Sequence, residues 1–143
     1  MNSNHPKGYV LDSFAMLCWL SDESGAEIVE KLLEKSRKQE IKLFMNWVNI
    51  GEVYYIIQRK DSQKKAVETV SLIKQLPIER VGYEESLVLL AGDYKAKYPI
   101  SYADAYCVAT AKSKELRVVT GDPEYEFVKD EVPIEWLPKK GNK

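Results

Sequence analysis

Four acidic side chains of this 143-residue chain stand at the ends of apolar segments or inside them. Asp12 follows Tyr-Val-Leu, and Asp122 follows Val-Val-Thr-Gly, while Glu52 and Asp104 lie within Asn-Ile-Gly-Glu-Val and Ser-Tyr-Ala-Asp-Ala. Two unit charges about 4 Å apart repel each other by roughly 4 kcal/mol at an effective dielectric of about 20. A divalent cation would relieve that repulsion. The four acids therefore predict a metal site, provided that the fold brings them to one place.

Two of the acids also have an ordinary structural explanation at the ends of predicted strands. Asp12 could cap the helix that follows it, although Ser13 could cap the same helix and leave the carboxylate free. Asp122 lies in Thr-Gly-Asp-Pro, which is typical of a surface turn. It is close in sequence to Thr120, whose hydroxyl could hold a metal-bound water.

The other two acids lie on predicted helices. Asp104 is the third residue after Ser101, an arrangement that resembles a capping box with Asp in place of Glu. Glu52 would ordinarily be an exposed helical residue. Here, Asn49 and Glu52 interrupt an otherwise apolar run over 47–57, and their spacing of three places them on one helix face. Two polar side chains on a mostly buried helix need polar partners or a bound ion. Together, the positions of the four acids favour a metal site over four separate structural roles.

Apolar strand patterns alternate with amphipathic helix patterns along the chain. Strands are predicted at residues 8–11, 41–45, 78–81, 116–120 and 134–137. Helices are predicted at residues 13–20, 24–33, 47–60, 65–76, 87–98 and 101–113, with only a turn at 121–123. Parallel strands need a helical crossover, so this order predicts a three-layer α/β/α sandwich around a parallel sheet. Ligands of such sheets bind outside the carboxyl ends of the strands, which is where Asp12 and Asp122 fall.

Length and composition indicate one globular domain, expected over residues 8–137, with flexible tails at 1–7 and 138–143. The formal net charge of -1 excludes a broadly basic surface, so any contact with nucleic acid must be local. Cys18 and Cys107 fall in apolar helical patterns, and we expect them to be buried and reduced. We find neither a membrane-spanning segment nor a signal peptide and expect a cytoplasmic protein.

Four segments, taken together, resemble the PIN-domain family and especially the small VapC-like ribonucleases of toxin–antitoxin pairs. They are Tyr9–Ser13, Asn49–Tyr55, Ile100–Ala105 and Val118–Tyr125, in the order of the family and spread over nearly the whole chain. The resemblance implies a sheet of five parallel strands and a Mg²⁺- or Mn²⁺-dependent endoribonuclease that hydrolyses RNA. It also implies a homodimer and a cognate antitoxin protein that covers the cleft.

The same resemblance implies which residues do the chemistry. The catalytic and metal-binding residues would be Asp12, Glu52, Asp104 and Asp122. Nearby polar groups that support them would be Ser13, Asn49 and Thr120. Mg²⁺ and Mn²⁺ favour carboxylate and water oxygens, and a cation-activated water would attack phosphorus in line. Without metal, at least one acid should have a raised pKa, and activity should fall as the pH drops.

Other interpretations stay open at this point. A PIN-like scaffold that binds RNA or a protein without cutting would keep the same fold, and a PIN nuclease in RNA processing would need no antitoxin. A phosphoacceptor signalling domain would carry a pair of acids at the end of the first strand, where only Asp12 is present. A dinucleotide-binding domain would carry a Gly-rich loop there, and none follows the first strand.

Overall fold

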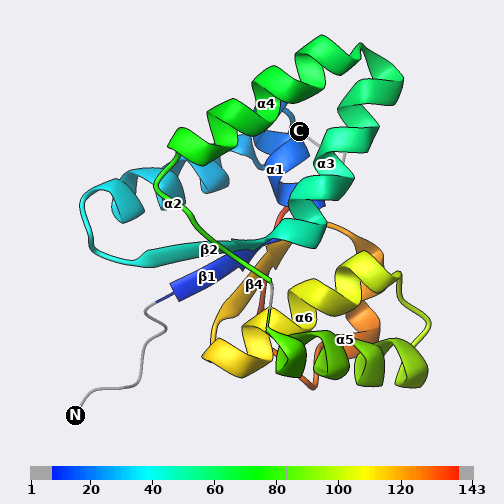
Figure 1. Ribbon diagram of the computed structural model, residues 1–143. Helices are drawn as coiled ribbons and strands as arrows, with labels where there is room; N and C mark the ends of the chain where they lie inside the picture. The colour runs from blue at the N-terminus through cyan, green and yellow to red at the C-terminus, as the bar shows by residue number, and fades with distance from the viewer. Residues whose placement is uncertain (1–7, 83, 139–143) are drawn as a thin grey trace.

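A five-stranded sheet forms the centre of the molecule, and all its strands run parallel (Figure 1). The computed structural model describes residues 8–82 and 84–138. The strand order is β3-β2-β1-β4-β5, with β1 (Gly8–Leu11), β2 (Lys42–Asn46), β3 (Glu79–Val81), β4 (Arg117–Thr120) and β5 (Ile134–Trp136). The predicted parallel sheet is confirmed. The tails predicted at 1–7 and 138–143 lie outside the described residues, apart from Pro138.

Helices cover both faces of this sheet. They are α1 (Ser13–Leu20), α2 (Ala26–Arg37), α3 (Trp47–Lys60), α4 (Gln63–Gln75), α5 (Glu85–Lys97), α6 (Tyr102–Lys114) and the 3-10 helix η1 (Pro123–Val128). Helices α5 and α6 lie on one face, while α1 and α2 lie on the other, with the α3–α4 hairpin rising on that side (Figure 1). This is the predicted three-layer α/β/α sandwich. Within the described residues, no helix has both the length and the apolar character needed to cross a membrane.

Helix starts differ from the predicted ones where local capping decides them. Helix α2 begins at Ala26 rather than at residue 24, because Gly25 adopts a left-handed conformation with a φ of 101°. Helix α4 begins two residues before Lys65, because the Ser62 hydroxyl accepts the Lys65 N–H at 3.0 Å and caps the helix. These are shifts of boundaries and leave the order of elements unchanged.

The largest difference lies after β4, where the sequence predicted only a turn at 121–123. The side chain of Asp122 accepts the backbone N–H of Glu124 at 2.9 Å, and the chain then winds into η1. Pro123 occupies the first helical position, where its fixed φ is favourable and its missing N–H costs nothing. The chain therefore presents a short helix, rather than a loop, next to the end of β4.

Two apolar layers hold the helices onto the sheet. Successive strand residues point to opposite faces, so Val118 packs in the layer of α5 and α6, whereas Val119 packs in the layer of α1 and α2. Burial on both faces explains why the strands read as continuous apolar runs. Cys107 belongs to the α6 layer, and Cys18 is buried in α1. Both are free thiols, as the sequence predicted.

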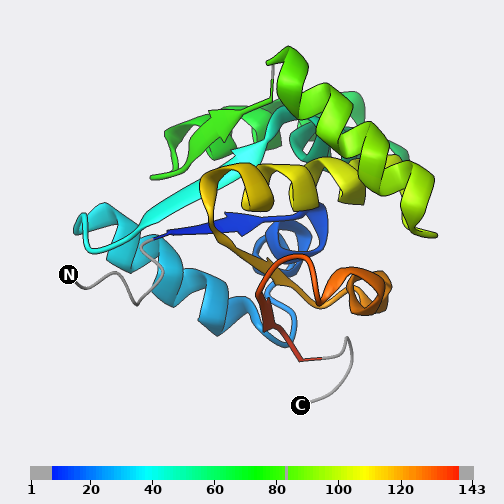
Figure 2. The ribbon, with the colours of Figure 1, turned by 90° about the horizontal axis from the view of Figure 1, so that it is seen from below.

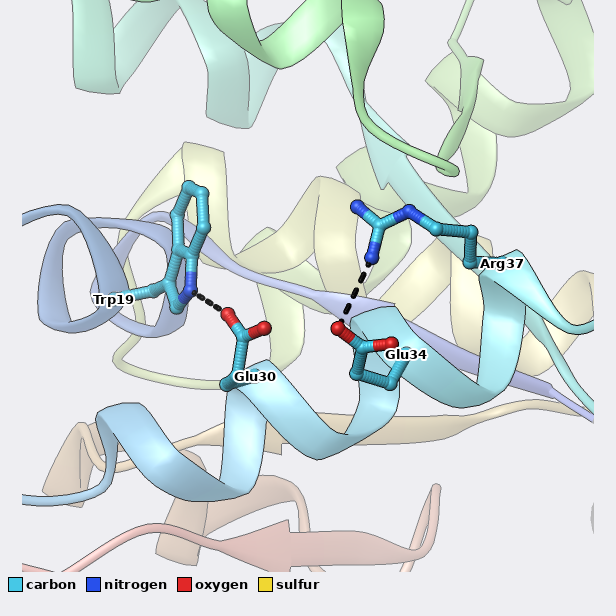
Figure 3. A network of polar contacts seen from close by, with 4 residues as sticks. All are labelled: Trp19, Glu30, Glu34 and Arg37. Atoms are coloured by element: carbon cyan, nitrogen blue, oxygen red, sulfur yellow. Dashed lines mark hydrogen bonds and ion pairs between the residues drawn. The ribbon is translucent and has the colours of Figure 1, made fainter.

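Apolar packing, rather than surface polar contacts, fixes α1 against α2. Met16 of α1 is fully buried in the layer that both helices share. On the surface, Trp19 Nε1 donates a hydrogen bond to Glu30 Oε1 at 2.8 Å (Figure 3). Arg37 and Glu34 form an exposed ion pair at 3.3 Å, a type of contact that contributes only about 0–1 kcal/mol.

Asn46 connects the end of β2 to the start of α3 and to α6. Its Oδ1 accepts the N–H of Val48 at 2.8 Å, and its Nδ2 donates to Thr110 Oγ1 at 3.1 Å. These bonds set where α3, which carries Glu52, leaves the sheet. Gly82 leaves room for this arrangement, because a Cβ at that position would lie 2.8 Å from Asn46 Oδ1.

Replacing Gly82 by alanine should destabilise the protein by about 1–3 kcal/mol. The new Cβ would be strained at a φ of +134° and would press on Asn46. Gly92→Ala is the control, because Gly92 lies within α5 and a Cβ added there would meet nothing within 4 Å. That change should stabilise the helix by about 0.5–1 kcal/mol. Urea unfolding measures both effects, and equal stability of the two variants would contradict the role given to Gly82.

Candidate metal centre

The carboxyl ends of β1 and β4 bring two acids to one edge of the sheet. The two strands are parallel neighbours with Leu11 paired to Val119, so Asp12 and Asp122 emerge close together. Figure 2 shows β1 pointing toward the end of the molecule where α1 begins and η1 lies. Asp104, in the first turn of α6, is near enough for the charges of Asp12 and Asp122 to raise its pKa.

Asp12 has two roles because its two oxygens have different partners. The side chain is 1% exposed, and Oδ1 accepts the Ala15 N–H at 2.8 Å, which caps α1. Its Oδ2 accepts the hydroxyl of Thr120 at 2.5 Å. Of the two possible caps of α1, Asp12 is the one observed, because the Ser13 hydroxyl donates to Glu52 Oε1 at 2.7 Å. Capping and membership of the acid cluster are therefore compatible in Asp12.

Thr120 lies between two of the acids and is fully buried. Its hydroxyl donates to Asp12, and the same oxygen accepts the backbone N–H of Asp122 at 3.0 Å. The sequence suggested that this hydroxyl could hold a metal-bound water. In the structure the hydroxyl orients Asp12 and the backbone of Asp122, and its contact with a metal-bound water stays a prediction.

Asp104 forms only half of the predicted capping box. Its backbone N–H donates to Ser101 Oγ at 3.1 Å, as expected. In the other half, the Ser101 N–H donates to Glu124 Oε1 at 3.1 Å rather than to Asp104. Asp104 Oδ1 accepts the hydroxyl of Tyr125 at 3.0 Å. The carboxylate of Asp104 is thus turned toward the acid cluster and η1, and away from the start of its own helix.

Glu124 is a fifth acid that sequence reasoning missed. Among the described residues, single carboxylate oxygens of Asp104, Asp122 and Glu124 lie within 4.8 Å of one another, a spacing that can hold a metal ion. Asp12 and Glu52 lie outside that group of three. A signal was present, because Asp-Pro-Glu is typical of a helix N-terminus, where an acid follows Pro in the first turn.

Helix α3 supplies the polar pair that the sequence placed on one face. Asn49 is fully buried, and its Nδ2 donates to the Ala103 carbonyl at 3.0 Å, which ties α3 to the first turn of α6. Within the described part of the chain, Asn49 Oδ1 is buried without a hydrogen-bond partner. Glu52 is half-buried, and its charge raises the pKa of Asp12. Both side chains therefore have polar partners on other helices, since Asn49 bonds to Ala103 and Glu52 bonds to Ser13.

Burial and neighbouring charges raise the pKa of two acids. Burial raises the pKa of Asp12 to about 7, against the opposing effect of the hydrogen bond from Thr120. Burial also raises the pKa of Asp104 to about 9, and a hydrogen bond with Glu124 adds to the rise. The expectation of at least one raised pKa is confirmed. At neutral pH Asp104 therefore holds a proton and Asp12 is partly protonated, and a bound cation would displace these protons.

The donor set is made of carboxylate oxygens, which suit a hard divalent cation such as Mg²⁺ or Mn²⁺. Cys107 is close enough to be affected by the charges of Asp12, Asp104 and Glu52, and its burial raises the pKa of the thiol well above the ordinary value. It therefore stays a neutral thiol and is a poor ligand for a soft cation. The residues present fit a Mg²⁺ or Mn²⁺ site better than a zinc site.

Several solved structures share this fold. A chain of the VapBC2 complex from Rickettsia felis, bound to a promoter DNA fragment, has a TM-score of 0.70 at 11% identity and covers 92% of this chain and 99% of its own. VapC20 of Mycobacterium tuberculosis, a Sarcin-Ricin loop cleaving toxin, has a TM-score of 0.66 at 12% identity. The match covers 82% of this chain and 92% of VapC20. A chain of VapBC-1 from nontypeable Haemophilus influenzae has a TM-score of 0.66 at 15% identity. The match covers 90% of this chain and 97% of that one.

At these identities, the structural likeness establishes the fold. A search of curated protein sequences finds no match. The family model for the PIN domain, however, matches residues 9–130, a range that includes all five acids of the cluster. The match therefore spans most of the chain and agrees with the observed sheet and with the place of the acids at its carboxyl edge. This chain belongs to the PIN-domain family.

Proposed function

We propose that this protein is a metal-dependent endoribonuclease and the toxin of a type II toxin–antitoxin pair. The observation that carries the proposal is the convergence of buried and half-buried carboxylates at the carboxyl edge of a PIN-family sheet. Membership of the family and a fold shared with chains from VapBC complexes support it. VapC20, with the same fold, is a toxin that cleaves the sarcin-ricin loop, which supports RNA as the substrate here.

The side chains proposed to hold Mg²⁺ or Mn²⁺ are the four predicted from the sequence, Asp12, Glu52, Asp104 and Asp122. A bound cation supplies Lewis acidity at the scissile phosphate and lowers the pKa of an attacking water. The protein holds the acids in place. Thr120 orients Asp12, Ser13 orients Glu52, and Asn49 anchors α3 beside the start of α6. In this proposal Ser13, Asn49 and Thr120 act through the acids rather than on the substrate.

Asp104→Asn should reduce Mn²⁺-dependent RNA cleavage by at least about 100-fold, because an amide supplies no anionic ligand. The assay uses the purified protein, Mg²⁺ or Mn²⁺, and a set of single-stranded and hairpin RNAs, with chelator as the metal-free reference. Glu126→Gln is the control, because Glu126 is exposed and pairs with Lys129 at 3.3 Å. It should cleave like the wild type.

Equal cleavage by the wild type and Asp104→Asn would show that the activity comes from a contaminating nuclease. Mn²⁺ binding without cleavage of any RNA would favour the alternative of a non-catalytic PIN-like scaffold. Cleavage together with a neighbouring gene that encodes no small DNA-binding protein would favour a PIN nuclease of RNA processing over a toxin.

Mn²⁺ should bind at least about tenfold more tightly at about pH 8 than at about pH 6. The cation displaces the protons of Asp104 and Asp12, whose pKa values are raised to about 9 and about 7. Calorimetry at the two pH values measures the difference, and Asp104→Asn should reduce it. An affinity that is independent of pH would contradict proton displacement.

The same raised pKa values affect the stability of the metal-free protein. The unfolded chain releases both protons near the ordinary pKa of 3.8, whereas the folded protein keeps them up to about 7 and about 9. The free energy of unfolding should therefore fall as the pH rises from about 4 to about 9. Thermal unfolding in chelator tests this, and Mn²⁺ should restore more stability at the higher pH.

A hollow of about 720 Å³ lies between α1, α3 and α4. Two of its lining residues, Leu17 and Ile56, follow Ser13 and Glu52 by four residues on the same helices, and Ser13 and Glu52 are hydrogen-bonded to each other. Its lining mixes apolar residues with both signs of charge: Leu20, Ile57, Leu72, Lys60, Lys65 and Glu68. We propose that an amphipathic segment of the antitoxin lies in this hollow and so covers the site.

Leu72→Glu should weaken binding of the antitoxin by at least about tenfold and leave RNA cleavage unchanged. Leu72 is 41% exposed in the lining of the hollow, so a charge there would be desolvated on binding. Val67→Glu is the matched control on the same helix, because Val67 is 51% exposed and lies outside that lining. The partner is the small protein encoded next to this gene, measured by calorimetry. Equal weakening by both variants would contradict this docking site.

A homodimer and a cytoplasmic location complete the proposal. Exposed apolar side chains on α3, α5 and α6, namely Tyr55, Leu89 and Tyr102, are available for contact with a second copy. The cytoplasm is where both an RNA substrate and a newly made antitoxin would be met.

A further inference from the structure

Ser101 caps the N-terminus of α6, and the backbone N–H of Ser101 is bound by a residue from a different part of the chain. In a capping box, the third residue after the cap returns its side chain to the N–H of the cap residue. Here that third residue is Asp104, yet the Ser101 N–H donates to Glu124 Oε1 at 3.1 Å. Glu124 therefore supplies the carboxylate that accepts the Ser101 N–H, a role that Asp104 would fill in a local capping box.

This arrangement matters because an Asp104 that capped its own helix would turn a carboxylate oxygen toward the Ser101 N–H, rather than toward Tyr125 and the other acids. Asp104 is 5% exposed, and its Oδ1 accepts the Tyr125 hydroxyl at 3.0 Å. Tyr125 is itself fully buried in the apolar layer of α6. Its ring is fixed by packing, so its hydroxyl has a fixed position from which to orient Asp104.

Helix η1 can deliver both groups because of its geometry. In a 3-10 helix, successive side chains are about 120° apart, so neighbouring residues point in different directions. Glu124 reaches the backbone of Ser101, while Tyr125 points into the core and meets Asp104. The start of η1 is fixed in turn by Asp122, whose Oδ1 accepts the Glu124 N–H.

We propose that Glu124 and Tyr125 are positioning residues that hold Asp104 ready for a divalent cation. Glu124 occupies the Ser101 N–H, so that Asp104 does not fold back onto it, and the Tyr125 hydroxyl fixes Asp104 Oδ1. This inference rests on the proposed function, in which Asp104 is a metal ligand. It assigns Glu124 a capping role, although its carboxylate is close enough to the other acids to be a ligand.

The test for Glu124 compares Mn²⁺ affinities of the purified full-length protein by calorimetry. Glu124→Gln keeps an oxygen that can accept the Ser101 N–H and should bind Mn²⁺ within about threefold of the wild type. Glu124→Ala leaves that N–H to Asp104 and should bind about tenfold or more weakly, as is typical when a group that orients a metal ligand is lost. A crystal structure of Glu124→Ala should show the Asp104 carboxylate accepting the Ser101 N–H.

Two outcomes would overturn the role of Glu124. If Glu124→Gln loses as much affinity as Glu124→Ala, Glu124 is a direct ligand. If Glu124→Ala binds like the wild type, the cap does not position Asp104. If the wild type itself binds no Mn²⁺, the proposed metal-dependent function is wrong. That outcome differs from a failure of this inference, in which the wild type binds Mn²⁺ and the variants do not behave as expected.

Tyr125→Phe provides an independent measurement that preserves the packed ring. It should weaken Mn²⁺ binding by about three- to tenfold with little change in the unfolding temperature. Tyr94→Phe is the matched control, because Tyr94 is 6% exposed in the same apolar layer but lies on α5. It should leave Mn²⁺ affinity unchanged. Wild-type affinity in Tyr125→Phe, or equal losses in both variants, would refute the role given to the Tyr125 hydroxyl.

Discussion

The cost of burying carboxylates together at one edge of the sheet is the constraint on which the rest of this structure depends. Asp12 and Asp104 are almost fully buried, and burial raises the pKa of both, to about 7 and about 9. Protons reduce this cost in the metal-free protein, and a divalent cation would reduce it in the proposed active form. The surrounding elements act to keep these groups together despite that cost.

The fold supports the cluster mainly through the starts of its helices. Asp12 caps α1, Asp122 caps η1, and Asp104 lies in the first turn of α6. Backbone N–H groups at helix starts lack intrahelical partners and carry partial positive charge, so they stabilise nearby anions. Hydroxyl donors from Ser13, Thr120 and Tyr125 then fix individual carboxylate oxygens. The apolar layers on both faces of the sheet hold these helix starts in register.

Sequence patterns predicted most of the fold, because each strand and helix carries its own periodicity. The five strands, the three layers and the burial of Cys18 and Cys107 follow from residues close in sequence. Inference failed where a side chain had two possible partners. The sequence leaves both Asp12 and Ser13 as possible caps of α1, and the Ser13 hydroxyl bonds instead to Glu52, which is 39 residues away. Glu124 escapes prediction because Thr-Gly-Asp-Pro is typical of a surface turn, whereas the segment after Asp122 starts a helix.

The sequence by itself determined the α/β architecture and the presence of four acids at strand ends and on inward helix faces. Only the tertiary structure decided which oxygen faces which partner. Asp12 meets Thr120 across 108 residues of chain, and Glu124 reaches Ser101 across 23. Periodicity reports which face of an element is buried, because burial depends on local spacing. The partner of a polar group depends on which distant segments the packed sheet places beside it. The residues next to that group in the sequence do not determine this.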